Sequence, residues 1–252
     1  MDIDKIIEQR DFLKDSLRQT INFRFTDQHQ GVPAPPLQKP LKEGQKSIEL
    51  PPPGDSWENF RGTDLLDAIN NRKSHRRFKS QSLSLEELSC LLWCTQGIKK
   101  ELAPGTALRT VPSAGCRHPF ETYLLVNRVD TLDAGIYRYL PMEHALVVEK
   151  KDADLVEKLT PATLGQAFVA SAPVTFVWTA IPYRTEWRYV HAAHRVILMD
   201  VGHVCQNLYL ACEAIGCGTC AVAAYHQELM DQLVQVDGDE EFTVYLAPVG
   251  KC

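Results

Sequence analysis

Apolar residues recur along this chain with two different periods. Apolar positions at every third or fourth residue predict four helices, at residues 1–20, 63–71, 85–96 and 190–215. Runs rich in β-branched and aromatic residues predict six strands, at residues 120–126, 135–140, 144–149, 172–180, 219–224 and 242–249. Strands and helices do not alternate regularly, and the second and third strands are typical of a hairpin. We therefore expect an α+β fold rather than a doubly wound sheet.

The helices at 63–71 and 85–96 have recognisable first residues. Thr63 can cap the first helix, and Ser84 with Glu87 forms a capping box for the second. The first helix is expected to bury an apolar stripe made of Leu65, Leu66 and Ile69. The residues between these two helices then form a loop.

The longest periodic element is residues 190–215. Its apolar residues step by threes and fours and are Val190, Ala193, Ile197, Val201, Val204, Leu208, Ala211 and Ile215. At ~1.5 Å per residue such a helix is roughly 39 Å long, which is the width of a small domain. We expect a central or interface helix whose apolar ridge lies against a second copy of the chain.

The first 61 residues differ from the rest. Residues 1–20 predict a short amphipathic helix, whereas residues 31–54 are proline-rich and aperiodic, which is typical of an extended arm lying on a surface. We expect a helix and arm over residues 1–61, followed by a compact domain over residues 62–252.

Composition excludes several classes of protein. With 252 residues, 44% of them hydrophobic, the chain can bury a large core, and a net charge of −5 gives no nucleic-acid footprint. No apolar run reaches the ~20 residues that span a bilayer, and the charged N-terminus is unlike a signal peptide. We therefore expect a cytoplasmic protein without a membrane partner, whose eight cysteines are mostly reduced.

Positive charge is concentrated in residues 71–80, which read NRKSHRRFKS. In an extended chain Arg72, Ser74 and Arg76 point to one side. Two guanidinium groups around a hydroxyl suit a phosphate monoester, which accepts bidentate bonds from arginine. The alternative interpretation is a solvated charged face.

Two short motifs favour a structural role. Gly216, Gly218 and Ala221 have the spacing of a dinucleotide-binding loop, but a helix precedes them and a strand follows, which is the reverse of the order that such a site needs. Cys217 and Cys220 have the spacing of a redox pair, yet they do not lie at a helix N-terminus that would activate a thiol.

His191 and His194 lie one helical turn apart and could bind zinc. The glutamate of a His-Glu-x-x-His motif is missing between them, so histidines on a helix surface are the better interpretation. A metal hydrolase remains a distant alternative.

The stretch RTVPSAGCRHPFE, residues 109–121, predicts a tight turn before a strand. Pro112 forces an extended residue before it, and Gly115 allows backbone conformations closed to other residues. The small side chains of Ser113 and Ala114 would let a flat ligand approach the backbone there.

Six collinear segments resemble the FMN-dependent nitroreductase superfamily, most closely its SagB-type branch of thiazole/oxazole-forming peptide dehydrogenases. They read NRKSHRRF, LSLEELSCLLWCTQGI, LRTVPSAGCRHPFETYLLV, GIYRYLP, DVGHVCQNLYLACEAIGCGTCAVAAY and YLAPVGK. The resemblance covers about residues 62–251. It implies a central, mostly antiparallel sheet flanked by helices, and an obligate homodimer with residues 190–215 at its interface.

The resemblance also implies a set of FMN-binding residues. The loop that holds the phosphate and ribityl chain corresponds to Arg72, Lys73, Ser74 and Arg76. The turn that reaches the flavin from the partner subunit corresponds to Pro112, Ser113, Ala114 and Gly115. The strand that lies against the isoalloxazine ring and offers it a backbone N–H corresponds to Val222, Ala223 and Ala224.

Two features depart from the family pattern. Many relatives use basic residues beyond the Pro-Val-Gly-Lys segment on the phosphate, whereas this sequence stops at Cys252. Either Lys251, with or without Arg109, substitutes for them, or the phosphate is less neutralised. The Lys-Tyr pair of the peptide dehydrogenases corresponds to Arg188 and Tyr189. Arginine stays protonated and cannot act as a base, which argues against azoline oxidation.

We therefore expect an FMN-dependent oxidoreductase that transfers hydride through the flavin by a ping-pong mechanism, with NAD(P)H as a transient reductant. Its substrate is expected to be a small molecule or to derive from a peptide. Arg188 and Tyr189 are either catalytic, or a surface residue and a half-buried interface residue. The alternative function is a flavin- or anion-binding protein without turnover.

Overall fold

A seven-stranded sheet forms the centre of the protein. The computed structural model describes residues 3–60 and 62–252, and within it all neighbouring strands of this sheet are antiparallel, in the order β1-β6-β5-β4-β7-β9-β8. A separate hairpin is formed by β2 and β3. The strands are β1 Ser47–Glu49, β2 Ile98–Ala103, β3 Thr106–Arg109, β4 Phe120–Val126, β5 Gly135–Leu140, β6 Ala145–Lys151, β7 Val174–Ala180, β8 Cys217–Thr219 and β9 Phe242–Lys251.

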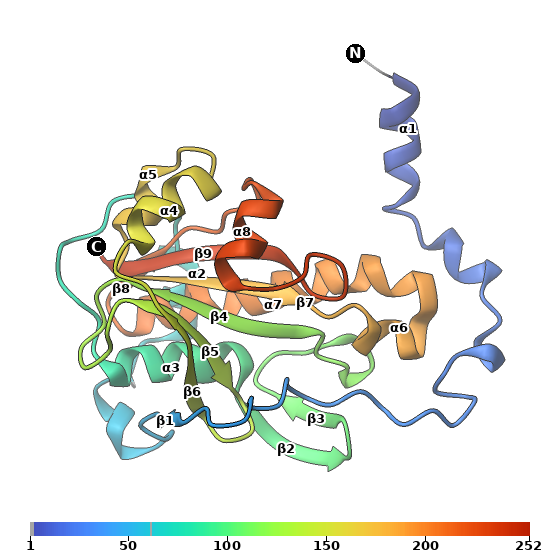
Figure 1. The fold of residues 1–252 in the computed structure, drawn as a ribbon, viewed down its shortest axis with the longest axis horizontal. Helices are drawn as coiled ribbons and strands as arrows, with labels where there is room; N and C mark the ends of the chain where they lie inside the picture. The colour runs from blue at the N-terminus through green and yellow to red at the C-terminus, as the bar shows by residue number, and fades with distance from the viewer. Residues whose placement is uncertain (1–2, 61) are drawn as a thin grey trace.

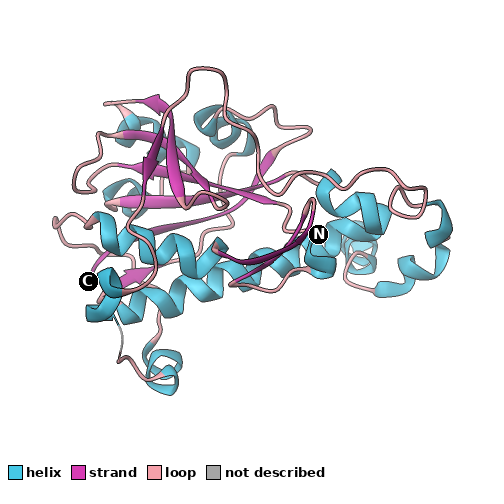
Figure 2. Ribbon diagram, turned by 90° about the horizontal axis from the view of Figure 1, so that it is seen from below, coloured by secondary structure: helices cyan, strands magenta, loops and turns pink. Residues whose placement is uncertain are grey.

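Helices cover both faces of the sheet (Figures 1 and 2). They are α1 Ile3–Asp11, α2 Leu65–Asn71, α3 Leu85–Gln96, α4 Leu155–Ala162, α5 Ala167–Ser171, α6 Tyr183–Tyr189, α7 Ala193–Ala214 and α8 Gln227–Val234. Short 3₁₀ helices lie at Asp15–Thr20, Phe23–Phe25, Asp55–Phe60, Ala114–Cys116 and Val190–Ala192. In the described part of the chain, none of these helices is long and apolar enough to cross a membrane.

Alternate side chains of the central strands pack into two separate hydrophobic cores. On β4, Leu124 and Val126 pack into the core that contains α3 and α7, whereas Tyr123 and Leu125 pack into the core that contains α4, α5 and α8. Every residue of β4 is consequently buried. The predicted α+β layout, with a mostly antiparallel sheet flanked by helices, is confirmed.

Most predicted strands lie within two residues of their predicted bounds, but the one at 219–224 does not. The structure has a strand only at Cys217–Thr219, and the chain then touches β9 again through a single bridge between Val222 and Leu246. The helix predicted to begin at Thr63 is capped instead by Asp64, whose carboxylate accepts from two backbone N–H groups of its first turn. The capping box of Ser84 and Glu87 is confirmed.

The apolar stripes of helices α2 and α7 do not have the surroundings that the sequence predicts. The side chains of Leu65, Leu66 and Ile69 on α2 are 61%, 73% and 51% exposed, so the prediction that they are buried is wrong for the single chain. The long helix is confirmed, but its predicted ridge faces the protein's own core, with Ile197, Val201, Val204 and Leu208 at 4% exposure or less. These residues are buried against the sheet and α3. The opposite face of α7 is the exposed one.

The N-terminal segment has a projecting part and a docked part. Helix α1 extends away from the body and buries none of its described side chains (Figure 1). Residues 31–50, in contrast, are held by buried cations. Arg109 donates to the carbonyl oxygen of Leu37 at 2.7 Å, and Arg138 donates to those of Lys39 and Pro40 at 3.0 and 3.2 Å.

Candidate functional site

The basic loop lies along the edge of the sheet beside β8. His75 donates its backbone N–H to the Thr219 carbonyl at 2.9 Å, and Ser74 forms a parallel bridge with Thr219. The Ser74 hydroxyl lies 2.9 Å from that of Tyr209 on α7, and the Arg72 guanidinium lies 5.2 Å from the centre of the Tyr209 ring. Arg72 and Ser74 therefore share the side that faces Tyr209.

Four cationic side chains of this loop have no ion-pair partner among the described residues and can therefore bind an anion. Within residues 3–60 and 62–252, Arg72, Lys73, Arg76 and Arg77 form no ion pair. Arg76 instead places its guanidinium 5.9 Å from the ring centre of Phe168. A group of unpaired positive charges around a hydroxyl is a suitable site for phosphate.

Tyr209 is a residue of this site that the sequence did not indicate. Its hydroxyl contacts Ser74 and also accepts the backbone N–H of Ala221 at 2.8 Å. The side chain is 9% exposed, so one buried phenol connects the basic loop to the segment after β8.

The segment after β8 offers two backbone donors rather than three. Val222 is buried and donates its N–H to the Leu246 carbonyl at 2.8 Å, so this group is already used. Ala223 and Ala224 are exposed, and neither donates its N–H to another group in the part of the chain that is described. These two residues can donate to a ligand.

The two substitute cations are engaged elsewhere. The Lys251 amino group bonds to the Glu87 carboxylate and, at 3.0 Å, to the Ile215 carbonyl oxygen. Burial opposes a charge there, but the hydrogen bond to Glu87 raises the pKa of Lys251. Arg109 is buried, bonds to Gln96 at 2.7 Å, and has its pKa lowered by burial to about 10. The structure does not bring Lys251 and Arg109 together with the basic loop as free cations.

The Pro112–Gly115 turn is fixed to α7 by a buried carboxylate. Asp200 accepts the Ser113 hydroxyl at 2.6 Å and the Ala114 backbone N–H at 3.0 Å. Burial raises the pKa of Asp200, although these hydrogen bonds oppose the shift. Asp200 is the second residue that the sequence did not indicate, since it occupies an ordinary position on a helix.

Arg188 and Tyr189 lie against this same turn. Gly115 has φ +60°, and a Cβ added there would lie 2.7 Å from the Tyr189 hydroxyl and 2.8 Å from the Arg188 side chain. Arg188 forms no hydrogen bond or ion pair with another described residue, and its guanidinium lies 5.5 Å from the Tyr189 ring centre. Val190 follows at φ 49° and ψ −134°, a strained conformation for a β-branched residue.

The basic loop and the turn attach to opposite sides of α7. Tyr209 and Asp200 are nine residues apart, which on an α-helix is roughly 13.5 Å along the axis and half a turn around it. Gly202, His203 and Gln206 lie between them on α7 and are exposed, and the turn before Asp200 exposes Leu198 and Met199, at 49% and 47%. The two halves of the candidate site therefore do not meet within one chain.

The other sequence motifs form no site in the described part of the chain. Cys217 and Cys220 are buried free thiols, and burial raises the pKa of Cys217 to about 12. His194 bonds to Glu186 at 2.7 Å. Among the residues that the structure describes, no three of His, Cys, Asp or Glu come together to hold a metal ion.

A seven-stranded antiparallel sheet on a long helix, with a cationic loop at its edge, defines an α+β protein whose candidate site is this loop. The family model described as "Nitroreductase family" matches residues 69–251. The chain belongs to the nitroreductase family.

Three similar proteins illustrate this relationship. MJ1384 of Methanocaldococcus jannaschii, which is named as a nitroreductase, is 34% identical over 187 residues, 74% of this chain and 90% of that protein. The microcin B17-processing protein McbC of Escherichia coli is 27% identical over 143 residues, 53% of this chain and 51% of McbC. A crystal structure of a Ralstonia eutropha JMP134 protein, also titled a nitroreductase, has a TM-score of 0.68 at 25% identity and covers 87% of this chain and 98% of that one. The relatives thus include both nitroreductases and a peptide-processing protein.

Proposed function

We propose that the protein is an FMN-dependent oxidoreductase that works as a homodimer by a ping-pong mechanism, with NAD(P)H as a transient reductant. The observation that carries this proposal is the cluster of unpaired cations around Ser74, beside two free backbone N–H groups. Membership of the nitroreductase family gives the reaction class.

The residues present fit the chemical groups of FMN. Arg72, Lys73 and Arg76 would bind the phosphate, and the Ser74 hydroxyl would donate to it or to the ribityl chain. The N–H groups of Ala223 and Ala224 would donate to the polar edge of the ring system. FMN, when bound, takes up a hydride from one substrate and passes it to another.

The geometry of α7 supports the homodimer. The exposed face of α7 is apolar at Leu198 and Met199, and the neighbouring α2 exposes Leu65, Leu66 and Ile69. Large exposed apolar patches mark surfaces that associate. Two copies packed through this face would bring the basic loop of one chain toward the Pro112–Gly115 turn of the other.

Arg188 and Tyr189 are proposed to act on the substrate. Arg188 is an unpartnered cation, so it would bind an anionic group or stabilise negative charge that develops during transfer. The Tyr189 hydroxyl would donate a hydrogen bond or a proton. Because arginine cannot serve as a base, a small-molecule or peptide-derived substrate is proposed without azoline oxidation.

The first 61 residues are proposed to form a helix and an arm that precede the FMN-binding domain of residues 62–252 and add β1 to the edge of its sheet. The family model begins at residue 69, which supports this division.

The eight cysteines are all free, which supports a reducing location such as the cytoplasm.

Alanine variants of the loop test the cofactor assignment. Arg72→Ala and Arg76→Ala should each weaken FMN binding roughly ten- to a hundredfold, because each removes a charge-assisted contact worth ~1.5–3 kcal/mol. Flavin fluorescence quenching measures the dissociation constant. Arg77→Ala removes an equal charge from the same loop and is the matched control. Wild-type affinity in Arg72→Ala and Arg76→Ala would mean that the loop is only a solvated surface.

A further inference from the structure

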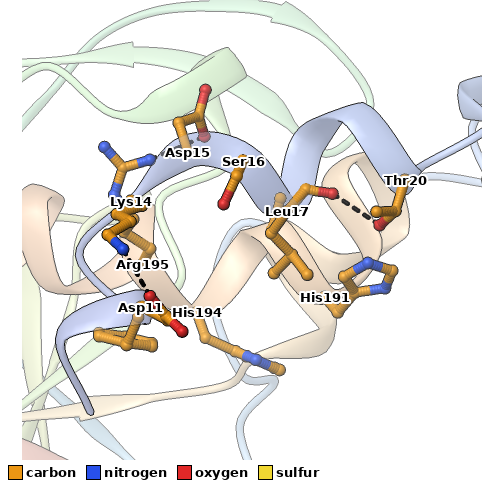
Figure 3. Close-up of a pocket in the computed structure, with 11 residues that line it drawn as sticks. Asp11, Lys14, Asp15, Ser16, Leu17, Thr20, His191, His194 and Arg195 are labelled. Atoms are coloured by element: carbon orange, nitrogen blue, oxygen red, sulfur yellow. Dashed lines mark hydrogen bonds and ion pairs between the residues drawn. The ribbon is translucent and has the colours of Figure 1, made fainter. Parts of the chain in front are cut away.

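A cavity lies where the N-terminal segment meets the residues that lead into α7 (Figure 3). Its volume is about 690 Å³, and residues 11–20 line it on one side and residues 191–195 on the other. An apolar cavity of about 150 Å³ already holds a benzene ring. This cavity therefore has room for a group of several fused rings.

The walls of the cavity are suited to an apolar group. Phe12, Leu17 and Ala192 contribute apolar surface, and Figure 3 shows Leu17 and His191 among the side chains that line it. Phe12 and Leu17 are 44% and 45% exposed, so both retain surface that a ligand can cover. Covering this surface would supply a hydrophobic driving force.

The charged groups around the cavity neutralise one another. Asp11 pairs with Lys14 at 2.7 Å, and Asp15 pairs with Arg195 at 2.7 Å and with Arg18 at 2.8 Å. Because these charges are paired with one another, the lining does not favour a charged ligand. His191 forms no hydrogen bond with another described residue, so one polar atom of a ligand can bond to its imidazole.

The cavity is adjacent to the proposed catalytic pair. Arg18, which follows Leu17 in the N-terminal segment, places its guanidinium 5.9 Å from the ring centre of Tyr189. His191 and Ala192 follow Tyr189 after a single residue, Val190. A ligand in the cavity would consequently lie next to the residues proposed to act on the substrate.

We propose that this cavity binds a bulky, uncharged aromatic part of the substrate, which the N-terminal segment holds beside Tyr189. The assignment to the substrate rests on the proposed oxidoreductase function, whereas binding itself follows from the size and lining of the cavity. The N-terminal segment is then a determinant of substrate specificity.

A neutral fluorescent probe tests binding without turnover. N-phenyl-1-naphthylamine should bind the wild-type protein saturably, at one site per chain. Leu17→Gln should weaken this binding roughly tenfold, because it replaces apolar surface with an amide. Leu17→Met keeps the surface apolar, and Leu41→Gln changes a similarly exposed leucine of the arm outside the cavity. Both should stay within about twofold of the wild type. Equal affinities in all variants, or no saturable binding, overturn the proposal.

Quinone reduction links the cavity to turnover. The ratio of kcat/KM for menadione, with two fused rings, to that for 1,4-benzoquinone should fall in Leu17→Gln and stay at the wild-type value in Leu41→Gln. An unchanged ratio with intact probe binding shows that the cavity is not the substrate site. Probe binding without any turnover of either quinone refutes the oxidoreductase proposal instead. If the probe binds only after dilution to monomers, a second copy covers the cavity and the proposal fails.

Discussion

Single side chains join parts of the candidate site that are far apart in the sequence. The Tyr209 hydroxyl contacts Ser74, 135 residues away, and Asp200 holds Ser113, 87 residues away. Sequence reasoning predicted the loop and the turn from their local chemistry, but it could not find these anchors. Tyr209 and Asp200 look like ordinary helix positions until the fold defines their partners.

Removal of the Tyr209 hydroxyl should weaken FMN binding roughly tenfold. Tyr209→Phe leaves the Ala221 N–H without an acceptor and frees the Ser74 side chain, at a cost of about 1–3 kcal/mol. A flavin fluorescence titration measures the effect. Tyr245→Phe is the control, since the Tyr245 hydroxyl forms no hydrogen bond with the residues that the structure describes. A Tyr209→Phe variant with wild-type affinity would show that the anchor does not support the cofactor site.

His118 should make stability depend on pH. Burial and then the nearby Arg109 charge lower the pKa of His118 to about 3. The unfolded chain takes up a proton near pH 6.5 and the folded chain only near pH 3, so the free energy of unfolding falls as pH drops through this window. The slope is up to about 1.4 kcal/mol per pH unit. Urea unfolding at several pH values should give a shallower slope for His118→Gln. Parallel profiles would contradict the prediction.

At the scale of elements, the sequence predicts those that bury a regular face. Strands β4 and β5 were predicted to the residue because a buried core side defines their ends. The β2–β3 hairpin was missed because β2 reads IKKELA and is almost wholly exposed. Helix α4 was missed because Pro161, a helix breaker, lies inside its last turn. β2 has no alternation of apolar and polar residues, whereas α4 does space Leu155, Leu159 and Ala162 as a helix does, over only eight residues.

A buried carboxylate should control how firmly the arm is attached. Glu121 accepts from Arg184 at 2.5 Å and from the Lys39 backbone N–H at 2.8 Å, and it pairs with Arg138 at 3.6 Å. Arg138 keeps its ion pair with Glu149 at 2.7 Å, but Glu121→Gln leaves the buried Arg184 guanidinium without a counter-charge, so the free energy of unfolding should fall by about 3–5 kcal/mol. Urea unfolding followed by tryptophan fluorescence measures this loss.

The control for Glu121 is another carboxylate that contacts the arm. Glu143 accepts from Gln38 at 2.7 Å but is exposed to solvent. Glu143→Gln should therefore cost less than about 1 kcal/mol. A similar loss of unfolding free energy in both variants would mean that burial of Glu121 does not determine how strongly it stabilises the attachment of the arm.

At the scale of the whole molecule, the arrangement of the site argues for two copies. One chain attaches the basic loop and the Pro112–Gly115 turn to opposite sides of α7, and the same helix exposes Leu198 and Met199. The sequence predicts that the apolar ridge of α7 lies against a second copy, but this ridge is buried in the chain's own core. The period of apolar residues shows which face of a helix is buried, and it does not say whether the chain's own core or a partner buries it.

A charge on this face should separate the copies and release flavin. Leu66 on α2 is 73% exposed, and burying a glutamate at its position in a dimer would leave that charge unpaired. Leu66→Glu should therefore give a monomer in light scattering, with FMN lost on gel filtration. Leu229→Glu, on α8 at the opposite side of the sheet, should remain a flavin-bound dimer. A Leu66→Glu monomer that keeps its flavin would contradict a site shared between chains.

The short strands at the two ends of the sheet protect the protein against aggregation. β1 and β8, the outermost strands, have three residues each, and the basic loop covers part of β8. The long strands β4 and β7 lie inside the sheet, and β9 pairs with β7 along one side and is covered on its other side by β8 at Val249–Lys251 and by Val222 at Leu246. A long bare edge is what lets foreign strands add to a sheet and start a fibril. With both edges this short, the protein can expose apolar helices for association without offering its sheet as a template for misassembly.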